Sequence, residues 1–128
     1  MKWTNDYIGI PYLRCGRTKE GADCYGLVRL VLVKVFGKAI PEYADYLTLS
    51  IQDQKRIIDE RIPVIDASPT ESPAEGDLIL FRLCGIPCHI GIYAGNGEFL
   101  HTLAPHDSCI ERVDSMKWRT RIEGFYRV

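Results

Sequence analysis

The chain has 128 residues and a mass of 14.6 kDa, the size of one ordinary domain with a single hydrophobic core. Hydrophobic residues make up 46% of the sequence and charged residues 26%, so the composition is that of a globular protein rather than a disordered one. The formal net charge of -1 excludes a broad basic surface for nucleic acid or for an anionic membrane.

The chain start and the cysteines bear on where the protein is made. No apolar segment follows a basic start, and the apolar run from Leu30 to Val33 is far too short to cross a bilayer. We therefore expect synthesis in the cytoplasm without a signal peptide or a membrane span. The five cysteines are an odd number, so at least one thiol lies outside any intramolecular disulfide, and a reducing cytosol favours free thiols throughout.

The first predicted element is a helix over 23–36. Asp23 can cap its start, a long apolar stretch follows, and Gly37 is typical of the position after a helix end. Because the stretch is apolar on most sides, we expect it to be buried near the centre. A shorter amphipathic helix is predicted over 51–61, after a weak capping box that begins at Ser50.

The second half of the sequence has the pattern of a sheet. Segment 66–76 is rich in Pro, Ser and Ala and is predicted to be a loop within one domain, because the pieces on either side are too small to fold alone. Short extended runs separated by Gly, Pro, Asn and Asp then predict antiparallel strands over 77–83, 88–94, 98–103, 110–113 and 124–128. Helices followed by strands predict an α+β fold, with residues 1–128 as a single domain.

Cys24 is the candidate nucleophile because of its position. It follows Asp23 in the first turn of the predicted buried helix, where unpaired N–H groups and the positive end of the helix dipole favour a thiolate. We therefore expect Cys24 to be alkylated at pH 6 to 7 faster than the other cysteines. A free cysteine is more often a simple core residue, so the assignment depends on a catalytic partner.

Two histidines can supply that partner if they share one face of a hairpin. A two-residue turn at Asn96-Gly97 would place His89 and His101 on opposite faces. A three-residue loop over 95–97, with Gly97 in the left-handed conformation, would place His101 opposite Gly91 and make His89 its diagonal neighbour. We predict the three-residue loop, because the missing side chain of Gly91 leaves room for an imidazole.

This arrangement predicts acyl transfer. Cys24 would be the nucleophile, His89 would take and return its proton, and His101 would orient and polarise the His89 ring. The backbone N–H of Cys24, free at a helix start, would be one oxyanion donor. Two half-buried strand histidines bonded to backbone are the structural alternative.

The sequence also contains soft ligands for zinc. They are Cys84, Cys88, His89, His101 and Cys109. The pattern is weak, because alternation puts Cys88 and His89 on opposite faces of one strand and the usual two-residue spacer is absent. We therefore expect no metal and no cofactor.

Four segments together resemble the NlpC/P60 cysteine peptidases: PYLRCGR over 11–17, GADCYGLV over 21–28, EGDLILF over 75–81 and HIGIYAGNGEFLH over 89–101. The resemblance implies a papain-like α+β fold, with N-terminal helices packed on a C-terminal antiparallel sheet. It also implies hydrolysis of bacterial peptidoglycan stem peptides, commonly between the γ-carboxyl of D-Glu and a diamino acid. By position, Cys24, His89 and His101 match the family's nucleophile, base and third polar residue. Tyr12 matches a tyrosine that helps to hold substrate or oxyanion.

The sequence departs from the family pattern near the nucleophile. Arg14-Cys15 stands where Trp-Gly is usual, and Tyr25 stands where a small residue is usual, so a narrowed cleft is one expectation. Segments 3–11, 23–29 and 118–127 are most similar to the branch found in phage and prophage tails, which implies tail proteins as partners and delivery to the cell wall by the particle. Alternatives are a non-catalytic tail component with the same fold and a secreted wall-degrading effector. The basic residues Arg14, Arg17 and Lys19 either meet muropeptide carboxylates or form a solvated loop.

Overall fold

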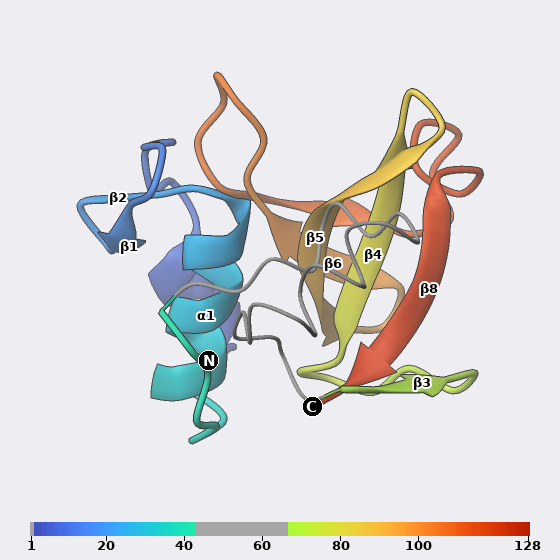
Figure 1. Ribbon diagram of the computed structural model, residues 1–128, viewed down its shortest axis with the longest axis horizontal. Coiled ribbons are helices and arrows are strands. Elements are labelled where there is room, and N and C mark those ends of the chain that lie inside the picture. The colour runs from blue at the N-terminus through green and yellow to red at the C-terminus, as the bar shows by residue number, and fades with distance from the viewer. Residues whose placement is uncertain (1, 43–66) are drawn as a thin grey trace, which may run out of the picture.

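The computed structural model describes residues 2–42 and 67–128. The helix predicted over 51–61 lies outside these residues. One α-helix, α1, spans Cys24–Lys34 and stands beside a six-stranded sheet (Figure 1). Within the described residues, no helix is both long enough and apolar enough to cross a membrane.

The helix begins where the sequence predicts. Asp23 is its N-cap, and the carboxylate of Asp23 accepts a hydrogen bond from the Gly26 N–H at 2.7 Å. The helix ends at Lys34, two residues before the predicted end, and Gly37 follows with φ 65°. Before α1 come a 3-10 helix, η1 (Trp3–Tyr7), and a small antiparallel hairpin of β1 (Arg17–Thr18) and β2 (Gly21–Ala22).

The sheet is entirely antiparallel, with the strand order β3-β8-β4-β5-β6-β7. Its strands are β3 (Ser68–Thr70), β4 (Leu78–Leu83), β5 (Ile86–Gly95), β6 (Glu98–His101), β7 (Cys109–Arg112) and β8 (Ile122–Arg127). All five predicted strands are present with shifted ends, which confirms the α+β prediction. The predicted loop over 66–76 is wrong at 68–70, because β3 pairs with β8 at the sheet edge, where Pro69 is tolerated.

Strand alternation divides the core between the two faces of the sheet. On one face, Leu27, Val28 and Val31 of α1 belong to the same buried cluster as Ile90 and Ile92 of β5. On the other face, a second cluster contains Ile79, Phe81, Phe99 and Trp118, all fully buried. His89 and His101 belong to this second face, because His89 is the direct cross-strand partner of Phe81 and the His101 ring packs against Phe99.

The β5–β6 turn differs from the prediction, although the register agrees with it. Gly95 pairs with Glu98, so Asn96 and Gly97 form a two-residue turn in which both have positive φ, 54° and 78°. A bulge between Tyr93 and Gly95 then shifts the pairing by one residue, and Ile92 pairs with Leu100. The predicted three-residue loop is therefore wrong, but the bulge produces the predicted register, with His101 opposite Gly91.

Candidate active site

Cys24 is the first residue of α1, and its position is fixed by the loop before the helix. The Asp23 carboxylate accepts from the Cys15 N–H at 2.9 Å and from Arg17 Nη1 at 2.9 Å, in addition to capping the helix. The Cys24 thiol interacts with the backbone N–H groups of Tyr25 and Ile90. It therefore lies beside strand β5, next to the residue that follows His89.

The thiol is not pre-ionised. Burial raises the pKa of Cys24 to about 11, against the lowering effect of the Ile90 and Tyr25 N–H groups. The expectation that the helix N-terminus alone makes Cys24 a thiolate near neutral pH is therefore wrong for the free protein. Desolvation outweighs the helix dipole, and the nearby Asp23 carboxylate also disfavours a second negative charge.

The two histidines lie together, as the sequence predicts. His89 and His101 are 1% and 2% exposed, and His89 Nε2 lies 2.8 Å from His101 Nδ1. Trp118 stacks on the His89 ring with centroids 5.9 Å apart, and Phe81 packs beside the same ring. Because Nε2 of His89 is used by His101, Nδ1 is the nitrogen left for Cys24. No hydrogen bond joins the thiol to either imidazole among the described residues.

Both imidazoles are neutral near pH 7. Burial, together with the charge of His101, lowers the pKa of His89 to about 3. Burial also lowers the pKa of His101, although a hydrogen bond to Glu111 opposes this shift. A neutral imidazole is the form that can accept a proton from a thiol.

Glu111 is a neighbour of the histidine pair that the sequence interpretation missed. Its Oε2 lies 2.5 Å from His101 Nε2, so it extends the line of hydrogen bonds beyond His101. Burial alone would raise the pKa of Glu111, but the side chains of His101 and Trp118 hold it below its usual value. The sequence held one indication of this contact: side chains alternate along the predicted strand 110–113, so Glu111 could face the histidines. That inference required the pairing register of β6 and β7, which the sequence did not provide.

The ionised Glu111 determines which ring nitrogens donate and which accept in the hydrogen bonds from Glu111 through His101 to His89. A carboxylate only accepts hydrogen bonds, so the proton of the neutral His101 ring lies on Nε2 and its Nδ1 accepts from His89 Nε2–H. That leaves Nδ1 of His89 unprotonated and available as a base. The hydrogen bonds from Glu111 through His101 thus select the tautomer of His89 that has a free acceptor at Nδ1.

Tyr12 lies near the nucleophile. It bridges to Ala22 just before α1, and burial together with the charges of Cys24 and Asp23 raises its pKa. Its hydroxyl therefore remains protonated near neutral pH and can donate a hydrogen bond.

The departures from the family pattern have local consequences. Tyr25 is 5% exposed, belongs to the core cluster, and donates its hydroxyl to the Pro41 carbonyl. The expected narrowing of the cleft by Tyr25 is therefore not seen, because the ring is packed inside the protein. Cys15 has φ 62°, a conformation that favours glycine, and its side chain is exposed.

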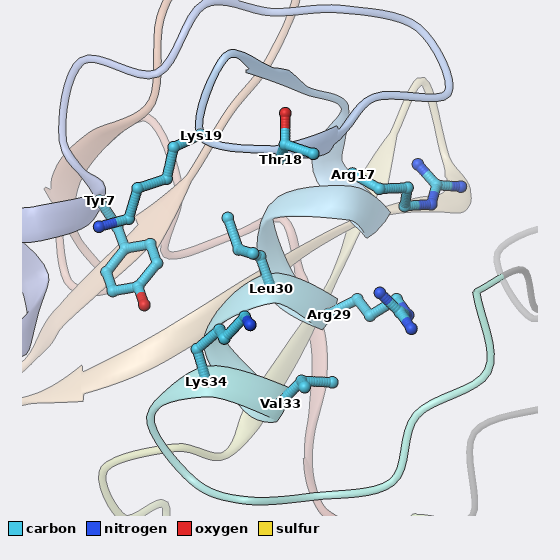
Figure 2. Close-up of a pocket in the computed structure, with 8 residues that line it drawn as sticks. All are labelled: Tyr7, Arg17, Thr18, Lys19, Arg29, Leu30, Val33 and Lys34. Atoms are coloured by element: carbon cyan, nitrogen blue, oxygen red, sulfur yellow. The ribbon is translucent and has the colours of Figure 1, made fainter.

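A cavity of about 560 Å³ lies along α1 (Figure 2). Its lining is strongly basic and includes Arg17, Lys19, Arg29 and Lys34. Three of these cations have partners: Arg17 pairs with Asp23, Arg29 donates to the Ile40 carbonyl, and Lys19 lies over the Tyr7 ring. In the described part of the chain, neither Cys24 nor a histidine lines this cavity, and Arg14 stays exposed outside it.

The zinc ligand set considered from the sequence does not assemble. Of its five members, only His101 and Cys109 fall in a group of neighbouring ligand atoms, and the third member of that group is Glu111. Cys84 stays exposed in the β4–β5 turn, and Cys88 is half-buried in β5 at the irregularity between the β4 pairs of Pro87 and His89.

Comparisons with known proteins agree with this fold. The model of the NlpC/P60 family matches residues 9–127. The chain is 28% identical over 123 residues to Murein DD-endopeptidase MepS/Murein LD-carboxypeptidase of Escherichia coli K12, covering 96% of this chain and 58% of that protein. It is 30% identical over 125 residues to Gamma-DL-glutamyl hydrolase of Bacillus subtilis, covering 94% of this chain and 27% of that protein.

Solved structures are similar as well. An NlpC/P60 family protein from Bacillus cereus has a TM-score of 0.67 and 25% identity, covering 94% of this chain and 36% of that one. The NlpC/p60 domain of peptidoglycan hydrolase SagA has a TM-score of 0.62 at 22% identity, covering 97% and 91% of the two chains, and supports the fold alone. The chain spans little more than half, or less, of the curated relatives named above. It belongs to the NlpC/P60 family and has its papain-like α+β fold.

Proposed function

We propose that this protein is a cysteine peptidase that hydrolyses bacterial peptidoglycan stem peptides. The observation that carries the proposal is the series of hydrogen-bonded side chains from Glu111 through His101 to His89, together with the Cys24 thiol beside the backbone of Ile90, the residue after His89 in β5. The names of two relatives, a murein endopeptidase and a γ-glutamyl hydrolase, support this substrate class.

In the first half of the reaction, the Cys24 sulfur attacks the carbonyl carbon of the scissile amide. The thiol proton passes to His89 Nδ1 as the C–S bond forms, because neither group is charged beforehand. The oxyanion then collapses, the C–N bond breaks, and His89 returns the proton to the leaving amine. A thioester of Cys24 remains.

In the second half, His89 takes a proton from water, and the hydroxide attacks the thioester carbonyl. The C–S bond breaks and the sulfur takes back the proton held by His89, which regenerates the neutral pair. The free acid of the stem peptide is released. His101 keeps its proton on Nε2 throughout, in a hydrogen bond to Glu111, and its role is to hold His89 in the reactive tautomer.

The oxyanion needs hydrogen-bond donors at each tetrahedral stage. The Cys24 backbone N–H is one, because the first N–H groups of a helix have no acceptor within the helix. The Tyr12 hydroxyl is a second, supported by its place near the charges of Cys24 and Asp23. Each such donor typically lowers the barrier by about 3 kcal/mol.

The proposed scissile bond joins the γ-carboxyl of D-Glu to a diamino acid. The resemblance of the four sequence segments supports this bond, as does the name of the Bacillus subtilis relative. Association with phage or prophage tail proteins, which would deliver the enzyme from the cytoplasm to the cell wall, is a further part of the proposal and rests on segments 3–11, 23–29 and 118–127 alone. A non-catalytic tail component would require a blocked cleft, and the buried Tyr25 argues against one.

The test is incubation of purified stem peptides with the wild type, Cys24→Ala and His89→Ala, followed by mass analysis of the products. Cys84→Ala is the matched control, since it removes an exposed thiol in the turn between β4 and β5. We expect cleavage by the wild type and Cys84→Ala only, with the product masses naming the bond. Cleavage by Cys24→Ala, or none by the wild type, would contradict the proposal.

A further inference from the structure

A second pocket borders His101, and neither Cys24 nor His89 is among the described residues that line it. It has a volume of about 380 Å³ and is lined by His101, Leu103, His106, Asp107, Cys109, Glu111 and Lys117. His101 therefore joins the histidine pair to this pocket. Its Nδ1 contacts His89, and its Nε2 contacts Glu111, which also lines the pocket.

The register of β6 and β7 brings three metal-ligating side chains together here. Cys109 is the direct cross-strand partner of His101, and Glu111 is two residues further along β7 on the same face. The imidazole nitrogen, the thiol sulfur and a carboxylate oxygen of these residues all lie within 4.8 Å of one another. None of them is fully exposed.

This donor set suits zinc. Zn²⁺ binds nitrogen, sulfur and oxygen together, and a tetrahedral ion holds such atoms about 3.3 to 3.8 Å apart. Small side-chain shifts would be enough: the His101–Glu111 contact must open from 2.5 Å, and the wider pairs must close. We propose that His101, Cys109 and Glu111 form an inhibitory Zn²⁺ site, with the pocket supplying space for water as the fourth ligand.

The inhibition rests on the proposed function and follows from the direction of the hydrogen bonds. A metal on His101 Nε2 takes the place of the proton there, so the ring proton moves to Nδ1 and points at His89 Nε2. His89 must then accept at Nε2 and carry its own proton on Nδ1, the side of Cys24. The base for the thiol is lost although neither Cys24 nor His89 touches the metal.

The proton balance and the neighbouring charges are defined. Each imidazole keeps one proton and only changes from the Nε2–H to the Nδ1–H tautomer. The Cys109 thiol releases one proton to solvent as it becomes a thiolate ligand. Around the site, the Glu111 and Asp107 carboxylates favour a cation and Lys117 opposes one. The Lys117 ammonium lies over the Trp118 ring at 5.0 Å.

The binding test uses Co²⁺ as a probe, because a thiolate bound to Co²⁺ gives a charge-transfer absorption band. We expect the band in the wild type, in Cys24→Ala and in the matched control Cys84→Ser, and we expect Zn²⁺ to abolish it by displacement. Cys109→Ser and Cys109→Ala, checked for folding by circular dichroism, should lack it. A band that persists in both Cys109 variants, or that disappears in Cys24→Ala, overturns the site.

The inhibition test measures stem-peptide cleavage against Zn²⁺ concentration, each variant relative to its own metal-free rate. Cys109→Ser should need at least about tenfold more Zn²⁺ for half-inhibition than the wild type, and a chelator should restore the wild-type rate. Equal sensitivity of the two overturns the inhibitory role. If the metal-free wild type cleaves no stem peptide, the proposed function fails, and the Co²⁺ spectra decide the metal site by themselves.

Discussion

Glu111 explains how a histidine can serve as the third residue of the line. A neutral imidazole can carry its proton on either nitrogen, and in a His–His pair the wrong choice on one ring forces the wrong choice on the other. The carboxylate at His101 Nε2 removes this ambiguity because it only accepts. Glu111 therefore fixes the tautomer of both buried imidazoles, and with it the nitrogen of His89 that can accept a proton.

Removal of Glu111 should slow the chemical step more than binding. We expect Glu111→Ala to lower kcat about 10- to 100-fold with little change in KM, because His89 then divides its population between two tautomers. Glu111→Gln should be milder, since its amide oxygen can still accept from His101. Nitrogen-15 spectra of the ring nitrogens should show His101 protonated on Nε2 in the wild type and mixed in Glu111→Ala. Unchanged spectra would exclude the tautomer role.

Alkylation of the cysteines should report the burial of Cys24. In the free protein at pH 7, we expect iodoacetamide to modify the exposed Cys15 and Cys84 before Cys24, because burial keeps the Cys24 pKa at about 11. The labelling rate at Cys24 should then rise steeply above pH 9. Peptide mapping by mass spectrometry measures the order, and preferential labelling of Cys24 at neutral pH would mean that a thiolate exists before substrate binds.

At the level of helices and strands, sequence patterns predicted the features that depend on residues adjacent in the chain. The Asp23 cap, the α1 start and all five predicted strands follow from local patterns, and so does the place of Cys24 in the first turn of α1. The β3–β8 pair depends on a partner far away in sequence, and the bulge in β5, although local, is not marked by any residue pattern. Glu111 was missed for the same reason, since only the β6–β7 register places it beside His101.

The start of α1 also depends on a close approach that helix propensity does not reveal. A Cβ on Gly26 would collide with the Gly16 carbonyl oxygen, which also accepts from Arg17 Nη1 at 2.8 Å. This contact holds the loop before the nucleophile against the first helical turn. The glycine is therefore required by packing, although it lies inside a helix.

Gly26→Ala should destabilise the protein. Helix propensity alone predicts a gain of about 1 kcal/mol, but the collision with backbone should give a net loss of about 1 to 3 kcal/mol in the free energy of unfolding. Urea denaturation measures the change. Lys34→Ala, at the other end of α1, is the control for propensity and should change stability by less than about 0.5 kcal/mol. A stabilised Gly26→Ala would show that Gly16 can move away.

For the whole molecule, the site depends on how the helix and the sheet are docked. Cys24 comes from α1, which stands beside the sheet (Figure 1), whereas His89, His101 and Glu111 come from three neighbouring strands. The two imidazole rings contact Phe81 and Phe99 of the second cluster. The buried histidine face is thus part of the core that folds the protein. Protonation of these rings should therefore weaken the fold as well as remove the base.

Stability should fall as the pH drops below the ordinary histidine pKa. Burial holds the folded pKa of His89 at about 3, so between about pH 3 and 6.5 the unfolded chain binds the extra proton and the folded protein does not. His89 alone should make the free energy of unfolding about 2 kcal/mol smaller at about pH 5 than at about pH 7.5. Urea titrations in chelator measure the difference. His89→Gln should reduce it, whereas His106→Gln, which removes an exposed histidine, should preserve it. Equal stability at both pH values would mean that His89 is protonated in the fold.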